Sequence, residues 1–170
     1  MTAGPGTGDS GPGKAGAATF AIGQDDLSGE AVRALLEYHL QQMHAQSPPG
    51  SVHALDLSGL QRANVTVWSV WRGDALAAVG ALRVLDDGGG ELKSMRTHPH
   101  FLRQGAAAAL LEHIVAAARA AGLRRLSLET GSGPAFDAAL ALYRRRGFRD
   151  GPAFADYVPT TFNQFLHLQL

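Results

Sequence analysis

The sequence contains no cysteine among its 170 residues. Disulfide scaffolds, thiolate metal sites and a cysteine nucleophile are therefore excluded. The chain also lacks an excess of charge of either sign, because Lys plus Arg and Asp plus Glu number 15 each. A neutral chain has no global electrostatic attraction to nucleic acid or to an anionic membrane, so we expect neither as a partner.

Long apolar runs are missing too. No uninterrupted apolar stretch reaches the roughly 20 residues that span a bilayer, and the N-terminus lacks the pattern of a signal peptide, so we expect a cytoplasmic protein. The seven histidines show no H-x-x-x-H spacing, and we expect no metal. Residues 1–18 are mostly Gly, Ala, Pro, Ser and Thr, which predicts a disordered tail. With 45% hydrophobic residues in the chain, residues 19–170 can form one domain with a core.

The apolar residues that are present recur with the periods of strands and helices. Asp25, Asp26 and Ser28 offer oxygens that could cap a first helix, and the prolines after Ser47 end it. Turn residues separate the later segments. We expect strands over 19–22, 65–71, 75–85, 91–97, 126–130 and 164–170, helices over 25–46, 105–121 and 135–146, and a short helix or a loop over 52–60. This order predicts a mixed sheet covered by helices.

The segment 91–111 carries the strongest chemical signal. A strand enters a short loop, and the loop feeds a helix through Gly105. The first N–H groups of a helix lack intrahelical partners and lie at the positive end of the helix dipole, so they can bind an anion. Glycine permits close approach of a phosphate, and Arg103 can add a charged contact. The alternative is an alanine-rich helix packed on a sheet, with Gly105 serving only as a turn.

Two motifs in this order resemble those of the GNAT N-acetyltransferase superfamily. The first is the strand ELKSMRT (91–97), followed by Pro99 and by LRQGAA (102–107). The second is ALALYRRRGF (139–148), and LETGS (128–132) between them resembles an uncharacterised branch of the family. Leu102 stands where the family has Gln or Arg, and Phe136 where it often has Asn, so those two side-chain contacts are not expected.

The resemblance implies an α/β fold with a mixed, mostly antiparallel central sheet, helices on both faces, and a splay between strands four and five. It also implies acetyl-CoA as co-substrate. The pantetheine would run along the backbone of residues 95–97, and the pyrophosphate would lie at the amides of residues 103–108. The implied cofactor-binding residues are Met95, Arg96, Thr97, Arg103, Gln104, Gly105, Ala106, Ala107 and Ala108.

The implied reaction is direct attack of a primary amine, from a small molecule or amino acid, on acetyl-CoA in a ternary complex. A base contributes roughly 10²–10⁴-fold to such a reaction. Glu91 resembles the strand-four glutamate that serves as base in some members, and Glu129 on the facing strand is the competitor. Tyr143 would protonate the thiolate that leaves. The first helices, the loop from Ser47 to His53 and the region near 156–157 would form the acceptor pocket.

Two other functions are weighed against this enzyme. One is a catalytically silent acyl-CoA sensor or regulatory module on the same fold, because fold does not settle function. The other is a nucleotide-triphosphate enzyme that uses the Gly105 loop, and the absence of G-x-x-x-x-G-K-[ST] argues against it. Because members of the family are often dimers, a homodimer through the second or the final strand is a further expectation.

Overall fold

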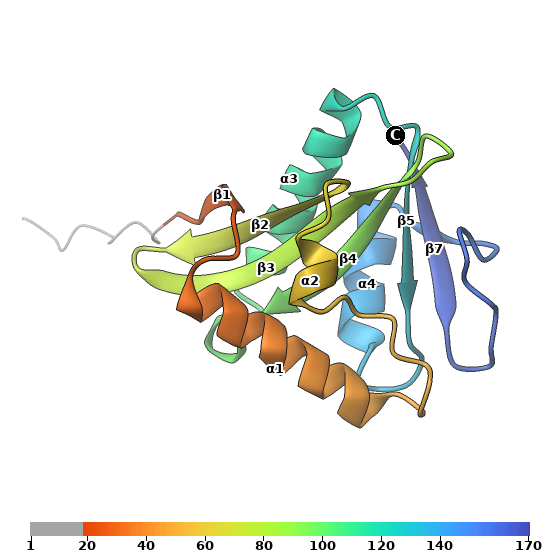
Figure 1. Ribbon diagram of the computed structural model, residues 1–170, viewed down its shortest axis with the longest axis horizontal. Coiled ribbons are helices and arrows are strands. Elements are labelled where there is room, and N and C mark those ends of the chain that lie inside the picture. Colours follow the sequence, from red (N-terminus) through yellow and green to blue (C-terminus); the bar gives the residue numbers. More distant parts are fainter. Residues whose placement is uncertain (1–18) are drawn as a thin grey trace, which may run out of the picture.

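A computed structural model describes residues 19–170 of the chain (Figure 1). The tail expected over residues 1–18 lies outside the described residues. In chain order the elements are β1 (Ala21–Asp25), α1 (Glu30–Gln46), α2 (Leu57–Leu60), β2 (Val65–Arg72), β3 (Ala75–Val84), β4 (Gly90–Thr97), η1 (Pro99–Phe101), α3 (Ala106–Ala120), β5 (Arg125–Thr130), α4 (Asp137–Arg146), β6 (Arg149–Asp150) and β7 (Gln164–Gln169).

The strands form one seven-stranded sheet in the order β1-β2-β3-β4-β5-β7-β6. All neighbours are antiparallel except β4 and β5, which run parallel. A parallel pair needs a long crossover connection, and here the segment with η1 and α3 supplies it. The mixed, mostly antiparallel sheet predicted from the sequence is confirmed.

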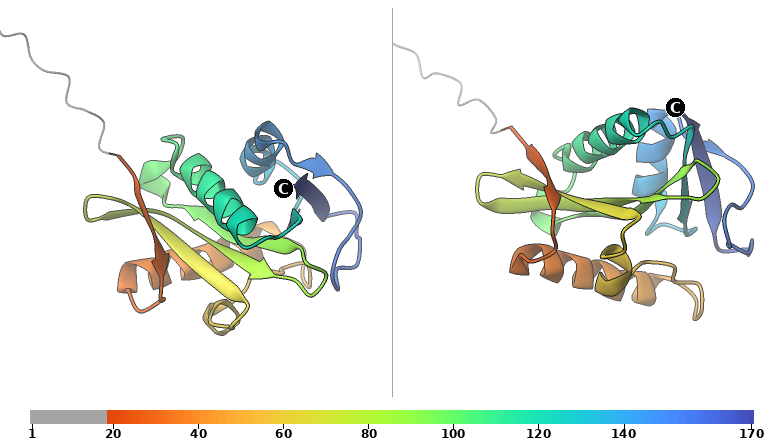
Figure 2. Two further views of the ribbon diagram at one scale, coloured as in Figure 1. Left: turned by 90° about the horizontal axis from the view of Figure 1, so that it is seen from above. Right: turned by 45° about the horizontal axis from the view of Figure 1, so that its top comes forward.

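Helices cover both faces of the sheet, as Figure 2 shows. α1 and α2 lie on one face, where Val32, Leu35 and Leu60 pack against the β2 and β3 residues Val67 and Val79. α3 and α4 lie on the other face and enclose a second cluster. Strands of this central sheet are buried on both sides, which explains why β3 is apolar at almost every position rather than at alternate ones.

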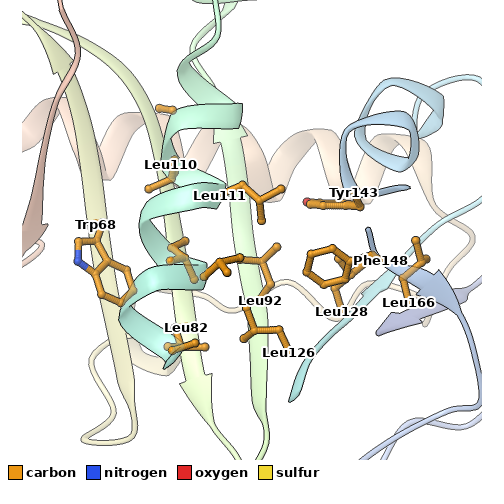
Figure 3. Close-up of a cluster of buried hydrophobic side chains, with 14 of the residues drawn as sticks. Trp68, Leu82, Leu92, Leu110, Leu111, Leu126, Leu128, Tyr143, Phe148 and Leu166 are labelled. Atoms are coloured by element: carbon orange, nitrogen blue, oxygen red, sulfur yellow. The ribbon is translucent and has the colours of Figure 1, made fainter. Parts of the chain in front are cut away.

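The larger cluster forms where α3 crosses β3 and β4 (Figure 3). Leu110 and Leu111 face this sheet from α3, and Phe148 and Leu166 complete the cluster toward β7. All four side chains are almost fully buried. The stripe at 110, 111, 114, 115 and 118 is the one that helical periodicity predicts, and it fixes α3 with its N-terminus beside the end of β4.

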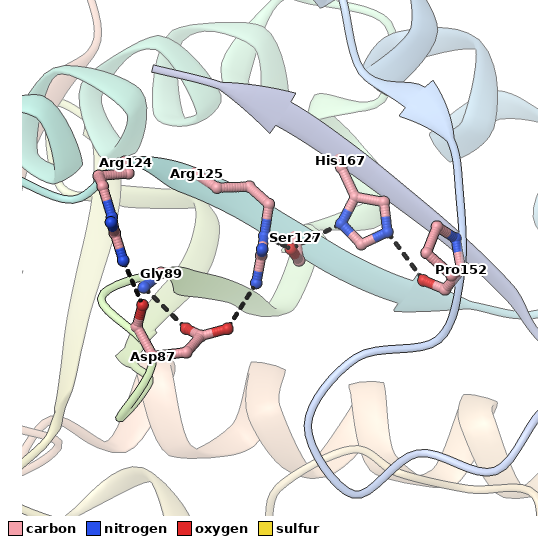
Figure 4. A network of polar contacts seen from close by, with 7 residues as sticks. All are labelled: Asp87, Gly89, Arg124, Arg125, Ser127, Pro152 and His167. Carbon is pink, nitrogen blue, oxygen red and sulfur yellow. Dashed lines mark hydrogen bonds and ion pairs between the residues drawn. The ribbon is translucent and has the colours of Figure 1, made fainter.

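Polar contacts hold the end of the sheet where β4 and β5 pair (Figure 4). Asp87, in the turn before β4, accepts from Arg125 Nη2 at 2.8 Å and from the Gly89 amide at 2.8 Å. Ser127 Oγ and His167 Nδ1 lie 2.8 Å apart and continue the network into β7. These contacts join the turn, β5 and β7 at the closed end of the β4–β5 pair.

Three details differ from the sequence-based expectations. α1 begins at Glu30 with Gly29 as its N-cap, while Asp25 and Asp26 accept hydrogen bonds from the turn at Leu27 and Ser28. The carboxylates therefore stabilise the turn before the helix and not the helix end. The short helix expected within 52–60 is only α2, capped by Asp56. The two-residue strand β6 was not predicted, since so short a strand leaves no periodic pattern.

Candidate active site

The parallel strands β4 and β5 pair over only two residue pairs. Gly90 lies opposite Leu126 and Glu91 opposite Ser127, and then the strands separate. Beyond this point β5 pairs only with β7, and β4 pairs only with β3. Among residues 19–170, the β5-facing backbone edge of β4 therefore has no strand partner from about Lys93 to Thr97. An extended ligand can add itself to this edge as a further strand.

A bulge in β4 accompanies the separation. Ala81 pairs with Lys93 but Val79 pairs with Arg96, so β4 holds one more residue than β3 over this interval. Ser94 takes up the extra residue in a left-handed conformation, with φ of 52°. Gly80 lies opposite, where an added Cβ would come 2.5 Å from Met95 Sδ. Bulges re-aim side chains next to active sites, and this one turns β4 at the mouth of the gap.

One pocket lies between this edge of β4, the start of α3 and one face of α4. Its lining combines small residues with three arginines and no acid. Small side chains leave room for a narrow extended ligand, and arginines without acids favour an anionic one. The lining includes Met95, Arg96, Thr97, Leu102, Arg103, Gly105, Ala106, Ala107, Ala108, Ala138, Ala139, Leu142, Tyr143 and Arg145.

The start of α3 leaves backbone amides available to a ligand. Gly105 caps the helix with φ of 90°, a left-handed conformation that favours glycine. The first hydrogen bond of this helix runs from the Ala109 amide to the Gly105 carbonyl, at 3.0 Å. The amides of Ala106, Ala107 and Ala108 precede it and have no hydrogen-bond acceptor within residues 19–170. Such amides, at the positive end of a helix, bind phosphate.

Of the predicted cofactor residues, only Gln104 does not line this pocket. Its side chain accepts from Arg72 Nη1 at 2.7 Å and donates to the His100 carbonyl at 2.7 Å. Its amide donates to the Phe101 carbonyl. Gln104 thus ties the loop to β2, while its neighbours Arg103 and Gly105 face the pocket.

A second pocket opens on the α1 side of the gap between β4 and β5. Segments far apart in the sequence form it: α1, the loop after α1, β4, β5 and the start of α4. Its polar lining includes His39, Ser47, His53, Lys93, Ser94, Arg96, Glu129 and Thr130. Five residues line both pockets, namely Met95, Arg96, Ala135, Ala139 and Tyr143. The two pockets therefore meet at the splay, one on each side of the sheet.

Glu91, the predicted base, lies beneath the second pocket and lines neither pocket. Its side chain is fully buried. Its carboxylate accepts from Tyr157 at 2.5 Å and forms ion pairs with Arg83 at 2.6 Å and with Lys93 at 3.4 Å. A proton from a bound acceptor would reach Glu91 only through these groups or through water.

Glu129, the competitor, does line the second pocket. Burial raises the pKa of this carboxyl to about 7; the Lys93 ammonium opposes the rise and the Glu91 carboxylate adds to it. A carboxyl with such a pKa is ionised in about half of the molecules near neutral pH, which is the range in which a general base works best.

Tyr143 lies where the two pockets meet, on the inner face of α4. It is almost fully buried and packs against Phe148, with ring centroids 5.8 Å apart. Burial raises the pKa of its hydroxyl well above the usual range, with a smaller opposing effect from Arg96. The hydroxyl therefore keeps its proton at neutral pH and can donate a hydrogen bond.

Several pocket residues were not identified from the sequence. The α4 wall of the first pocket includes Ala138, Ala139 and Leu142, which share a face with Tyr143 at spacings of three and four, and Ala135 lies just before this helix. This spacing is a signal that could have identified them. Lys93 and Ser94 of the second pocket carry no such signal, because the bulge interrupts the alternation of side chains along β4.

Comparison with known proteins is consistent with this geometry. The family described as Acetyltransferase (GNAT) family matches residues 32–148. The uncharacterized N-acetyltransferase YedL of Escherichia coli K12 is 51% identical over 151 residues, which cover 89% of this chain and 95% of that protein.

Solved structures show the same fold. A Klebsiella pneumoniae protein named for acyl-CoA N-acyltransferase activity has a TM-score of 0.76 and 27% identity, over 91% of this chain and 99% of that one. A GNAT family acetyltransferase of Elizabethkingia anophelis, solved with acetyl-CoA bound, has a TM-score of 0.62 and 16% identity, over 89% and 98% of the two chains.

None of the helices within residues 19–170 has the length and apolar character that crossing a membrane requires. The same residues hold no group of three or more His, Asp or Glu side chains placed to bind a metal ion.

Proposed function

Because the chain belongs to the GNAT family of acetyltransferases, we propose that it transfers the acetyl group of acetyl-CoA to a primary amine of a small molecule. The CoA moiety would occupy the pocket between β4, α3 and α4, and the amine would enter from the α1 side. Direct attack in a ternary complex would join the two.

One observation carries this proposal. Met95, Arg96 and Tyr143 line both pockets, so a thioester in one pocket can meet an amine in the other without leaving the protein. The amides of Ala106 to Ala108 and the arginines 103 and 145 supply the positive surroundings that a pyrophosphate requires. The free edge of β4 supplies hydrogen-bonding groups for the pantetheine amides. Holding both reactants in one place supplies much of the rate enhancement.

Proton transfers complete the reaction. The amine nitrogen forms a bond to the acetyl carbonyl carbon, and the carbon–sulfur bond then breaks. We assign the amine proton to Glu129, because its carboxyl lines the acceptor pocket with a pKa of about 7. We assign protonation of the CoA thiolate to Tyr143, whose hydroxyl is protonated at neutral pH and lies at the junction of the pockets.

An acceptor screen tests the proposal. Purified protein is incubated with acetyl-CoA and with amino acids, polyamines, aminoglycosides and other small amines, and free thiol is followed. We expect thiol release that depends on an acceptor and a product one acetyl group heavier. Tight acetyl-CoA binding with no acetylated product from any amine would instead support the silent sensor.

A further inference from the structure

Arg96 is a partly buried cation in the acceptor pocket, and no acidic side chain of residues 19–170 is paired with it. Its Nε donates to His39 Nδ1 at 3.1 Å, and its guanidinium lies 5.5 Å from the centroid of the Tyr38 ring. None of the ion pairs within residues 19–170 includes Arg96. The terminal nitrogens Nη1 and Nη2 likewise have no hydrogen-bond acceptor in that part of the chain. Removing such a charge from water costs free energy unless an anion compensates it.

His39 holds this guanidinium without adding charge. Burial, followed by the charges of Arg96 and Lys93, lowers the pKa of His39 to about 4. The imidazole is therefore neutral at pH 7, and its Nδ1 accepts the hydrogen bond from Nε. One edge of the guanidinium is fixed by this contact. The two terminal nitrogens keep the fork geometry that matches a carboxylate.

The ionisable groups around this pocket sum to an excess of positive charge. The cations are Arg83, Lys93 and Arg96, and the acids are Glu91 and Glu129. Glu129, with its pKa of about 7, is only partly ionised at neutral pH. His53, whose pKa is lowered chiefly by burial, adds no charge there. Since the whole chain is neutral, the excess is a property of this pocket.

Ser94 is a second polar group in the pocket that lacks a partner in the described part of the chain. Its Oγ is buried and has no hydrogen-bond partner within residues 19–170, and the residue is only 8% exposed. It lies two positions before Arg96, at the bulge, and lines the same pocket. A buried hydroxyl without a partner is destabilising, and a bound anion would supply the missing acceptor.

The direction of the Arg96 side chain indicates which substrate it serves. It reaches His39 and Tyr38 on α1, on the face of the sheet opposite α3 (Figure 2). The anion-binding amides at the start of α3 lie on the other face, with Arg103 and Arg145 lining the pocket there. The hydrogen bond to His39 therefore holds the guanidinium of Arg96 on the α1 side of the sheet, although the residue lines both pockets.

We propose that the acceptor carries a carboxylate as well as its amine, and that the Arg96 guanidinium, with Ser94 Oγ, binds this carboxylate. The inference rests on the proposed function of the site. It places the carboxylate against β4 and α1 and the amine toward Glu129 on β5. Free amino acids are the simplest molecules that present both groups.

Calorimetry on the complex with CoA tests the inference apart from catalysis. The probes are the common L-amino acids, each paired with its carboxamide, together with the aminophosphonate analogue of the amino acid that binds most tightly. We expect at least one amino acid to bind and its carboxamide to bind about tenfold or more weakly, as for loss of a charged hydrogen-bond acceptor. Carboxamides that bind as tightly as the acids, no binding by any acid, or tighter binding of the phosphonate would each overturn the assignment.

Substitutions of Arg96 and Ser94 test whether these residues bind the carboxylate. Arg96→Gln is expected to abolish the preference for acid over carboxamide, while Arg119→Gln, on the exposed face of α3, keeps the preference. Ser94→Ala, the smaller change, is expected to reduce the preference and covers the case in which the arginine variant does not fold. A rise in the Kd of acetyl-CoA, with the preference intact, would overturn the inference.

Acetylation assays separate this inference from the proposed function. Amino acids that bind through Arg96 but are never acetylated would contradict the proposed function and support the carboxylate site. Amines acetylated at equal rates with and without a carboxylate would support the proposed function and overturn the carboxylate site.

Discussion

At the scale of single residues, Glu91 and Glu129 differ in their surroundings more than in their chemistry. Glu91 is fully buried and lies between Arg83, Lys93 and Tyr157. Glu129 faces the acceptor pocket, and its carboxyl has a pKa of about 7. Glu91 forms ion pairs with Arg83 and Lys93, whereas burial without a direct ion pair raises the pKa of Glu129 into the neutral range.

This difference predicts distinct pH profiles for two variants. In the parent, kcat should fall as the pH drops through about 7, because Glu129 then takes up a proton and no longer acts as base. Glu129→Gln should abolish this fall of kcat at low pH, and it should lower kcat by about 10²-fold or more. Glu91→Gln should keep this fall but move it to lower pH, because the negative charge of Glu91 raises the pKa of Glu129.

Steady-state rates over pH 5 to about 9 measure both effects. If Glu91→Gln loses the fall of kcat at low pH while Glu129→Gln keeps it, Glu91 is the base, as the strand-four motif predicts, and the proton then travels through Lys93, Tyr157 or water.

The Tyr143→Phe variant tests whether Tyr143 protonates the leaving thiolate. The ring and its packing on Phe148 remain, and only the hydroxyl is lost. We expect kcat to fall by about 10²-fold, with the Kd of acetyl-CoA nearly unchanged, because the interaction is made only in the transition state. Isothermal titration with acetyl-CoA, next to rate measurements, separates the two quantities. An increase in Kd that accounts for the whole loss would show that Tyr143 serves binding instead.

At the scale of elements, the start of α3 can be tested by one pair of substitutions. Gly105 has φ of 90°, and an added Cβ would meet no atom within 4 Å. Gly105→Ala therefore introduces the backbone strain alone, and Gly105→Glu adds a negative charge where the pyrophosphate is expected to lie. We predict that the glutamate weakens acetyl-CoA binding by about a hundredfold relative to alanine. Equal affinities of the two variants, measured by calorimetry, would place the phosphates elsewhere.

Much of the fold could be predicted because the elements carry regular patterns. The α3 stripe at Leu110, Leu111 and Ile114 and the apolar run of β3 determine which faces are buried. The strand end, the loop and the helix start at Gly105 could equally be predicted, because they are contiguous in sequence. The two-residue β6 and the true start of α1 were not, since they depend on pairing with β7 and on turn hydrogen bonds.

The acceptor pocket could be predicted only in outline. The loop from Ser47 to His53 lines this pocket, as expected. Tyr157 does not line it; its hydroxyl accepts a hydrogen bond from Lys93 and donates one to Glu91. A glutamate on a strand can line the pocket, as Glu129 does, or form buried ion pairs, as Glu91 does. Which of the two occurs depends on residues far along the chain. Tyr157 lies 66 positions from Glu91, and no local pattern reveals that contact.

At the scale of the whole molecule, His39 links the acceptor pocket to stability. Its pKa is about 4 in the folded protein against an ordinary 6.5. Between these values the unfolded chain binds a proton that the folded protein does not, so this group lowers stability as the pH falls from about 6.5 to about 4. The loss amounts to about 3 kcal/mol over the window. Glu129, whose pKa is raised, acts in the opposite direction over an overlapping range.

The prediction therefore concerns the difference in the free energy of unfolding between a His39 variant and the parent protein. His39→Gln, whose amide oxygen can still accept from Arg96, should become more stable relative to the parent as the pH falls from about 6.5 to about 4. Denaturant unfolding at several pH values measures this, with His44→Gln, on the exposed side of the same helix, as the matched substitution. A constant difference across this range would show that the folded protein protonates His39 readily. The homodimer expected from the family resemblance stays a prediction.

The central claim is that the acetyl group passes directly from one pocket to the other, across the junction at Met95, Arg96 and Tyr143. Initial rates at varied concentrations of acetyl-CoA and of the acceptor test it most directly. Transfer within a ternary complex predicts double-reciprocal lines that intersect, and no release of CoA in the absence of acceptor. Parallel lines, with a burst of CoA release before acceptor is added, would show an acetylated enzyme intermediate and would contradict the account.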